Sequence, residues 1–171
     1  MSIIHVITPA AIRRLIRAAG GRRIRQSLDL YEEVPGTTDA NGIVHEIFTT
    51  YLDDLVEKTV SLMHMQRSKT MLPRHVREIA SILGDEDSDS TNLPYVSFAA
   101  VGRHIRLTSG APPTTRFSTE AMKLLLLVAI TKTIAHLRSA AGLVSHGDRK
   151  TVRTRDVYNV RRICEGFPTP P

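Results

Sequence analysis

Residues 116–165 decide the fold, and they read RFSTEAMKLLLLVAITKTIAHLRSAAGLVSHGDRKTVRTRDVYNVRRICE. A long apolar run without proline fills residues 121–144. Ser118 precedes this run at the place expected of a helix N-cap, and Glu120 falls in the first turn, where a negative charge suits the helix dipole. The pattern predicts a helix over residues 118–146, about 40 Å long because each residue adds roughly 1.5 Å. Such a helix needs packing partners along both of its ends.

The composition favours a helical core and excludes several classes of protein. The chain has 171 residues, 42% of them hydrophobic, with few aromatic residues and no tryptophan. The single Cys164 excludes an internal disulfide framework and a multi-cysteine metal site. Lys123 and Lys132 bound the most apolar part of the long helix, and a membrane span needs about 20 apolar residues. We therefore expect a buried helix rather than a membrane span, and we see no signal peptide in residues 1–8.

The charge is distributed unevenly along the chain. Residues 1–84 hold 11 bases and 9 acids, residues 85–92 hold four acids and no base, and residues 93–171 hold 12 bases and 4 acids. The formal net charge is +6. This balance makes a nucleic acid or another polyanion the leading candidate for a partner.

The same order of elements occurs twice. The first copy predicts helices over residues 8–20, from about Gly42 or Ile43 to Met65, and over 73–83, with basic loops between them. Pro35-Gly36 and Asn41-Gly42 mark a non-helical connection before the second helix. Residues 85–92 contain no apolar residue and predict a linker. The second copy predicts helices over 96–105, over 118–146 and from Asp156 onward. Lys69-Thr70 and Lys150-Thr151 fall at the same place in the two copies, which indicates an internal repeat.

Short motifs in both copies carry a family resemblance. Those of the first copy are Ala11-Ile12-Arg13-Arg14-Leu15, Gly20-Gly21, Arg23-Ile24, Leu30-Tyr31-Glu32-Glu33 and Lys69-Thr70. Those of the second copy are Leu93-Pro94-Tyr95, Arg116-Phe117, His146, Arg149-Lys150-Thr151-Val152, Asp156-Val157 and Arg161-Arg162-Ile163. The first set resembles the histone-four type of core histone and the second set the histone-three type. The chain thus looks like a histone doublet, similar to those known from some giant viruses.

The resemblance implies an all-α chain of two histone folds, each with a short, a long and a short helix. Residues 1–84 would form the first fold, 85–92 an acidic linker, 93–166 the second fold and 167–171 a disordered tail. The two folds would pair head to tail in an intramolecular handshake, because one fold alone cannot bury its apolar stripes. The handshake brings the first loop of each half beside the second loop of the other half.

The implied function is the packaging of double-stranded DNA into nucleosome-like particles in chromatin. If the protein is viral, the location would be either the host nucleus or the viral factory and virion; otherwise it would be the nucleus. Contacts with phosphate and the minor groove would be independent of sequence. The residues implied to bind DNA are Arg13, Arg14, Arg17, Arg22, Arg23, Lys69, Thr70, Arg116, Arg149, Lys150 and Thr151. Those implied in self-association are Leu143, His146 and Asp156. A partner of the histone-two-A/two-B type would dock on the first half.

Several positions depart from the family pattern. His75 stands where the family usually has an aspartate, and Pro73-Arg74-His75 is more similar to the histone-two-A type. Asn159 replaces a leucine of the self-association surface. On the first helix of the second half, Ser97 and Ala100 stand where the family has DNA-contacting residues, which weakens DNA contact there. Arg103 or Arg106 either compensates for this loss or is simply solvated. The acids Asp53, Asp54 and Glu57 are either solvated or face a basic partner.

Two alternatives remain open at this stage. One alternative to the histone-four/three doublet is a doublet of the histone-two-A/two-B type. The other is a histone-fold pair that serves as an interaction module in a transcription or DNA-repair complex. The second alternative predicts fewer bases at the loops than this chain has. We expect no enzyme, since nothing orients or activates Cys164 against His146. We also expect no cofactor, no metal, no membrane association and no small-molecule substrate.

Overall fold

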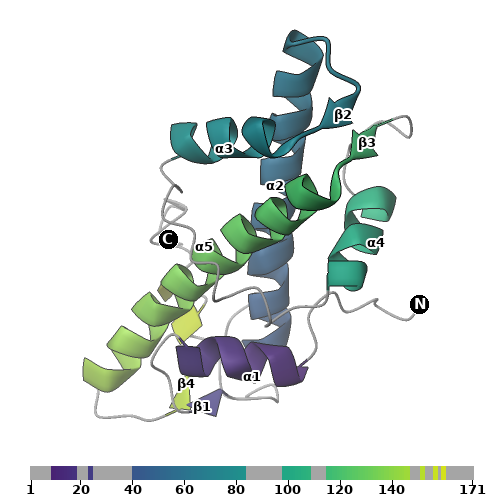
Figure 1. The fold of residues 1–171 in the computed structure, drawn as a ribbon. Helices are drawn as coiled ribbons and strands as arrows, with labels where there is room; N and C mark the ends of the chain where they lie inside the picture. The colour runs from purple at the N-terminus through teal and green to yellow at the C-terminus, as the bar shows by residue number, and fades with distance from the viewer. Residues whose placement is uncertain are drawn as a thin grey trace, which may run out of the picture. The chain divides into compact units, whose positions relative to one another are not determined.

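The computed structural model describes residues 9–18, 23–24, 40–83, 98–108, 115–146, 151–152, 156–157 and 159–160. In chain order its elements are α1 (Pro9–Ala18), β1 (Arg23–Ile24), α2 (Ala40–Met65), β2 (Thr70–Met71), α3 (Pro73–Ile82), α4 (Phe98–Thr108), β3 (Arg116–Phe117), α5 (Thr119–His146) and β4 (Thr151–Val152) (Figure 1). Helices dominate, and each strand is two residues long. The predicted all-α class is therefore confirmed. The predicted linker and C-terminal tail lie outside the described residues.

The chain forms two compact units, and both combine the two predicted halves of the sequence. Unit 1 comprises residues 1–7 and 48–132, and unit 2 comprises residues 8–47 and 133–171. Each unit thus contains residues from before and after the predicted linker at 85–92. This is the composition that a head-to-tail pairing of two histone folds produces.

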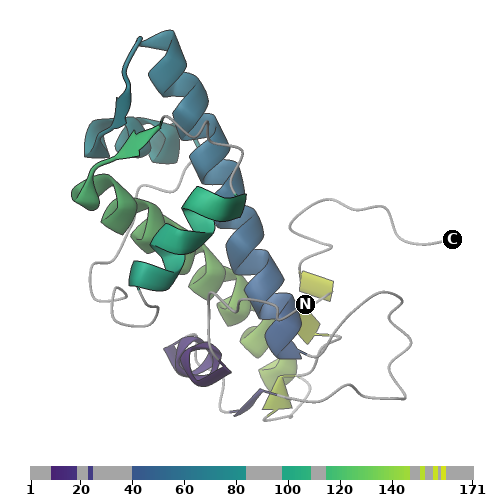
Figure 2. The ribbon, with the colours of Figure 1, turned by 90° about the vertical axis from the view of Figure 1, so that its right-hand side faces the viewer.

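In unit 1 a parallel strand pair joins the second loop of the first half to the first loop of the second half. β2 pairs with β3 so that Thr70 lies opposite Arg116 and Met71 opposite Phe117. The Arg116 N–H donates to the Lys69 carbonyl at 3.2 Å, and the Ser118 N–H donates to the Met71 carbonyl at 3.0 Å. Figures 1 and 2 both show the two strands side by side near the end of α2. The juxtaposition of Lys69 and Thr70 with Arg116 follows directly from this pairing.

The core of unit 1 is aliphatic, as the composition predicts. Six consecutive residues of α5, Leu125 to Ile130, are all buried, so the helix is covered on every side there. They share the core with residues of α2, α3 and α4, among them Phe48, Leu52, Met63, Val76, Val101 and Ile105. By length and composition one described segment, Thr119–Leu143, would suffice to cross a membrane, but 61% of its apolar window is buried inside the protein. This burial agrees with the expected core helix.

The start of α5 is set by a side-chain cap. Ser118 Oγ accepts the N–H of Ala121 at 3.1 Å, as predicted for an N-cap, and the Ser118 carbonyl accepts the first helical hydrogen bond from Met122 at 3.1 Å. A serine N-cap typically stabilises a helix by about 1 kcal/mol. Ser118 also belongs to the strand ladder through its N–H, so one residue ties β3 to the long helix.

The predicted start of α2 was wrong. α2 begins at Ala40 and includes Asn41-Gly42, which the sequence pattern places in a non-helical connection. A glycine in a helix costs only about 0.5–1 kcal/mol relative to alanine, and the burial of Val44 and Ile47 in the next turns outweighs it. α4 extends past Ile105, the last apolar residue of its predicted stripe, and ends at Thr108.

Unit 2 contains the second strand pair and α1. β1 pairs with β4 in parallel, with Arg23 opposite Thr151 and Ile24 opposite Val152. α1 buries Ala11, Ile12 and Leu15 against the unit. Of the predicted last helix, residues 156–157 and 159–160 are described as helical, and its remainder lies outside the described residues.

Candidate nucleic-acid interface

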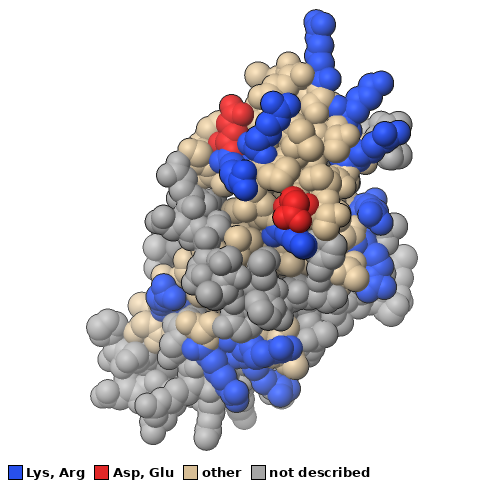
Figure 3. All heavy atoms as spheres, in the orientation of Figure 1, with Lys and Arg blue, Asp and Glu red and all other residues tan. Residues whose placement is uncertain are grey.

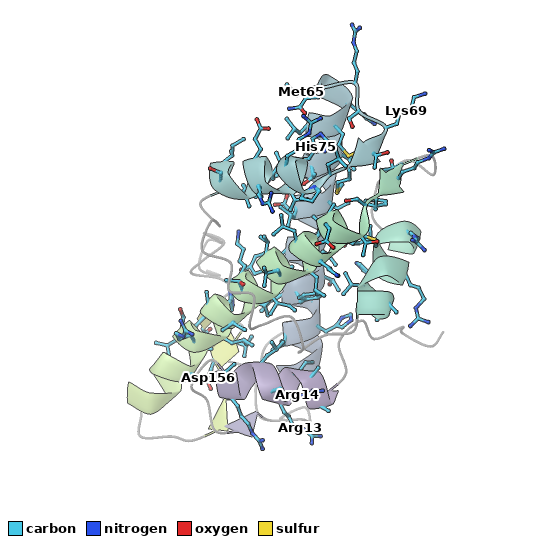
Figure 4. The ribbon with its side chains drawn as sticks, viewed as in Figure 1. Arg13, Arg14, Met65, Lys69, His75 and Asp156 are labelled. Atoms are coloured by element: carbon cyan, nitrogen blue, oxygen red, sulfur yellow. The ribbon has the colours of Figure 1, made fainter. Side chains whose placement is uncertain are left out.

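The strand pair of unit 1 brings two cationic side chains together. Lys69 directly precedes β2, Arg116 lies in β3, and both side chains are exposed. Paired strands lie about 4.8 Å apart, so the two side chains start from neighbouring backbones. Figure 4 shows Lys69 extending away from the ribbon at this end of the molecule. Two exposed cationic residues that are 47 positions apart in sequence thus lie on adjoining backbones.

A tight turn between α2 and β2 positions Lys69. The Arg67 N–H donates to the His64 carbonyl at 3.1 Å, and the Ser68 N–H donates to the Met63 carbonyl at 2.9 Å. These two bonds form a Schellman motif, in which Arg67 takes the left-handed conformation with φ of 54°. The Ser68 hydroxyl donates to the Thr70 carbonyl at 2.9 Å, which fixes the chain on either side of Lys69.

Further cations extend this site into a continuous basic edge. Figure 3 shows Lys and Arg side chains along the edge formed by the end of α2, β2, β3 and α4. We call these residues the basic edge: Arg67, Lys69, Arg103, Arg106 and Arg116, all of them exposed. The described segments 66–72, 98–108 and 115–119, which carry them, contain no Asp or Glu.

The side chains of the basic edge have no ion-pair partner among the described residues, whereas other cations of unit 1 do. Lys58 Nζ lies 2.8 Å from the Asp54 carboxylate, Lys123 Nζ lies 3.5 Å from Glu120, and Lys132 Nζ lies 4.9 Å from the ring centroid of Tyr51. Internal contacts thus neutralise or shield these three cations, whereas Arg74 and Arg77 of α3 are exposed and, like the basic edge, have no ion-pair partner among the described residues.

Unit 2 presents a second set of predicted residues. Arg13, Arg14 and Arg17 are exposed on α1, opposite its buried stripe. Arg14 Nε donates to the Ala10 carbonyl at 3.5 Å. Figure 4 shows Arg13 and Arg14 projecting from this helix, and Figure 3 shows a gathering of Lys and Arg over it. The three arginines form one cationic face.

The loops of unit 2 are described in part. The backbones of Arg23 and Thr151 are opposite each other in the β1–β4 pair, as the handshake predicts. Their side chains lie outside the described part of the chain, and so do the whole residues Arg22, Arg149 and Lys150. DNA binding by these five residues stays a prediction.

The acids of α2 pair within the chain. His104 Nε2 lies 2.8 Å from Asp53 Oδ1, which links α4 to α2, and Asp54 pairs with Lys58. Glu57 is exposed. The contribution of His104 was not predicted, because no local pattern places it beside an acid 51 residues away.

His75 takes a role that the sequence pattern did not show. The side chain is fully buried, and its Nδ1 accepts the N–H of Leu72 at 3.0 Å. Burial lowers the pKa of His75 from its ordinary value of 6.5, Arg74 lowers it further, and Glu78 opposes the shift. An imidazole that accepts a backbone hydrogen bond thus stands where the family usually has a carboxylate.

The predicted self-association residues differ in exposure. Leu143 is 46% exposed near the end of α5, whereas Asp156 is buried in unit 2 with 5% exposure. The side chain of His146 lies outside the described part. Two other large apolar side chains are more exposed: Met65 at 81% and Ile82 at 72%. Within the described residues, no group of three His, Cys, Asp or Glu side chains is placed to hold a metal ion.

Comparison with known proteins supports the histone fold. No model of a protein family matches the sequence, and no curated protein matches it. Among solved structures, the crystal structure of the histone from Methanopyrus kandleri is similar, with a TM-score of 0.66 and 25% sequence identity. The similarity covers 90% of this chain and 92% of that one. The chain therefore has the histone fold over nearly its whole length.

Proposed function

We propose that this chain is a structural DNA-binding protein that packages DNA into nucleosome-like particles without reading its sequence. The observation that carries the proposal is the β2–β3 pair, which joins Lys69 and Arg116 in an exposed basic edge without acids. The similarity to a solved histone over 90% of the chain supports the same function. As a histone doublet, with one half of the histone-four and one of the histone-three type, the protein would act in chromatin, either in a nucleus or in a viral factory and virion.

Electrostatics gives the mechanism. Cations that bind DNA phosphates release condensed counterions, and this release supplies most of the affinity that does not depend on sequence. Lys69 and Arg116 of unit 1 would bind one stretch of backbone, with an arginine inserted in the minor groove. Arg23, Lys150 and Thr151 would form the equivalent contact in unit 2, and the arginines of α1 a third. DNA that bends easily would be favoured over any particular sequence.

We further propose that apolar surfaces of the free chain mediate assembly. Leu143, with His146 and Asp156, would associate with the same region of a second copy. The exposed Met65 and Ile82 would receive a histone-two-A/two-B-like partner on the first half. The exposure of both side chains by more than 70% supports this, because large apolar side chains at such exposure suit a partner interface. Pro73-Arg74-His75 supports the opposite assignment, in which this chain is itself the two-A/two-B type.

A salt titration tests the DNA grip. We expect the affinity for a DNA duplex to fall steeply as the salt concentration rises. In Arg116→Glu the slope of log affinity against log salt should be smaller by about one, the change expected when one phosphate contact is lost. Arg138→Glu is the matched control, since Arg138 is exposed on α5 outside both strand pairs, and it should bind more like the wild type. An affinity that barely changes with salt would show that phosphate contacts do not drive binding.

A nuclease digest separates packaging from the interaction-module alternative. The protein, reconstituted on long DNA with its partner histones, should protect a defined length of DNA if it wraps DNA in a particle. A continuous smear of fragments would favour an interaction module in a transcription or DNA-repair complex.

A further inference from the structure

His75 fastens the turn that connects the basic edge to α3. β2 ends at Met71, Leu72 is the N-cap of α3 with extended backbone (φ −108°, ψ 159°), and Pro73 follows at the first helical position. Two hydrogen bonds close the turn: the Leu72 N–H donates to His75 Nδ1, and the His75 N–H donates to the Leu72 carbonyl, both at 3.0 Å. In most helices with this reciprocal arrangement, Glu or Gln occupies the position of His75.

The ring can perform this task only in its neutral form. Because Nδ1 accepts a hydrogen bond, the single ring proton must reside on Nε2. Nε2 is buried and has no hydrogen-bond partner among the described residues. A second proton would have to bind Nδ1, and a protonated Nδ1 cannot accept from Leu72. Uptake of a proton therefore breaks the bond that holds the turn and leaves a charge in the core.

The released residue adjoins the DNA-binding ladder. Leu72 directly follows Met71, whose carbonyl accepts from Ser118, and the Lys69 carbonyl accepts from Arg116. We propose that His75 is a positioning residue for the basic edge: it holds Lys69 and Arg116 in register through Leu72, and it releases them when its ring takes up a second proton. The consequence, which rests on the proposed function, is that mild acid weakens DNA binding.

The direction of the pH effect follows from the environment of the ring. Among the described residues, the charged groups that act on it are Arg74 and Glu78, both on α3; Gln66, at the end of α2, donates to Glu78 at 3.5 Å. Burial and Arg74 lower the pKa of His75 in the folded chain, so the unfolded chain takes up the proton first as the pH falls. The contribution of neutral His75 to the free energy of unfolding is therefore fully present above about pH 7 and decreases as the pH falls below 6.5, the ordinary pKa of histidine.

The predicted sign is opposite to that of simple charge. Acid raises the positive charge of the protein, which by itself would strengthen binding to DNA. The comparison with His75→Gln is therefore needed to separate the turn from the other histidines of the chain, among them the buried His136.

The test measures affinity for a DNA duplex at pH 7.5, 6.5 and 5.5 at constant ionic strength. The DNA affinity of the wild type should fall roughly threefold to tenfold from pH 7.5 to pH 5.5, which is the effect expected from the loss of one hydrogen bond. In His75→Gln, the amide oxygen still accepts from Leu72 and does not titrate, so binding at pH 7.5 should be retained and the acid loss abolished. His64→Gln is the matched control: His64 is exposed on α2, and its variant should keep the wild-type pH profile.

A second measurement does not depend on DNA. Amide hydrogen-exchange protection in the free wild-type protein should fall below pH 6.5 at Leu72, Arg116 and Ser118, while that of Val56 in the core of α2 should hold. The proposal is overturned if the DNA affinity of the wild type stays level or rises in acid. It is also overturned if the affinity of His75→Gln falls in acid as much as that of the wild type. If the protein fails to bind DNA at pH 7.5, the proposed function is wrong, and the exchange data still decide the role of His75.

Discussion

Arg67 occupies a backbone conformation that favours glycine. Its φ of 54° places it at the left-handed position of a Schellman motif, where helices most often end with glycine. A residue with a Cβ atom in this conformation costs roughly 1–2 kcal/mol. The guanidinium is exposed, with no hydrogen-bond or ion-pair partner among the described residues. The chain thus carries strain at a position where the charge serves no described contact within the protein.

We expect Arg67→Gly to stabilise the fold while weakening its grip on DNA. Relief of the strain, less the extra freedom of glycine in the unfolded chain, should raise the free energy of unfolding by up to about 1 kcal/mol. Thermal denaturation would then shift upward by roughly 2–4 °C. The slope of log DNA affinity against log salt should be smaller by about one, because one phosphate contact is lost. Arg67→Lys keeps both charge and strain and should change neither; a glycine variant that binds like the wild type would contradict this role.

At single residues the sequence predicts chemistry better than geometry. The family resemblance placed Arg116 near Lys69 and Thr70, and the structure confirms that their backbones adjoin: Thr70 lies opposite Arg116, and the Arg116 N–H donates to the Lys69 carbonyl. The unusual identity of His75 was visible in the sequence, but its burial and its bond to Leu72 were not, because both depend on how α3 packs. Arg67 was recognised as basic, whereas its conformation depends on a dihedral angle that residue patterns do not encode.

Among the elements, long helices were predictable and strands were not. The bounds of α5 match the prediction within one residue, since Ser118 caps the helix as expected. Two-residue strands are too short for an alternating pattern. They form because residues far apart in sequence are brought together by helix packing, so the β1–β4 and β2–β3 pairs result from the fold. The start of α2 was misplaced for a related reason: packing overrode the Asn41-Gly42 turn signal.

The exposed end of α5 leads to a prediction about assembly. Leu143→Glu should weaken self-association by tenfold or more, because burial of a leucine stabilises an interface by about 1.5–3 kcal/mol. Sedimentation of the free protein over a range of concentrations measures this. Ser139→Glu adds the same charge to an exposed position one turn earlier and controls for charge alone. If both variants associate like the wild type, the surface lies elsewhere.

At the scale of the whole molecule, the two halves of the sequence depend on each other. Both units combine residues from before and after the predicted linker, and each strand pair joins one half to the other. The resemblance to the histone fold predicted this arrangement. DNA contacts stay predictions in both units, and in unit 2 the residues Arg22, Arg149 and Lys150 lie outside the described part of the chain.

The halves should therefore fail to fold separately. Residues 1–92 and 93–171, produced as two chains, should each show little helical circular dichroism alone and regain it when mixed in equal amounts. The reason is that each lacks the partner that covers its long helix, such as the buried Leu52 of α2 and Leu125 of α5. Stable helical structure in either isolated half would contradict the mutual dependence.

The uncompensated charge of the basic edge links folding to the availability of a polyanion. Five cations without acids between them repel one another, which destabilises the compact state of the free protein. Under the proposed function, bound DNA would replace this repulsion with attraction and, by mass action, stabilise the folded chain. Chains made in excess of the available DNA would then be the first to unfold and be degraded.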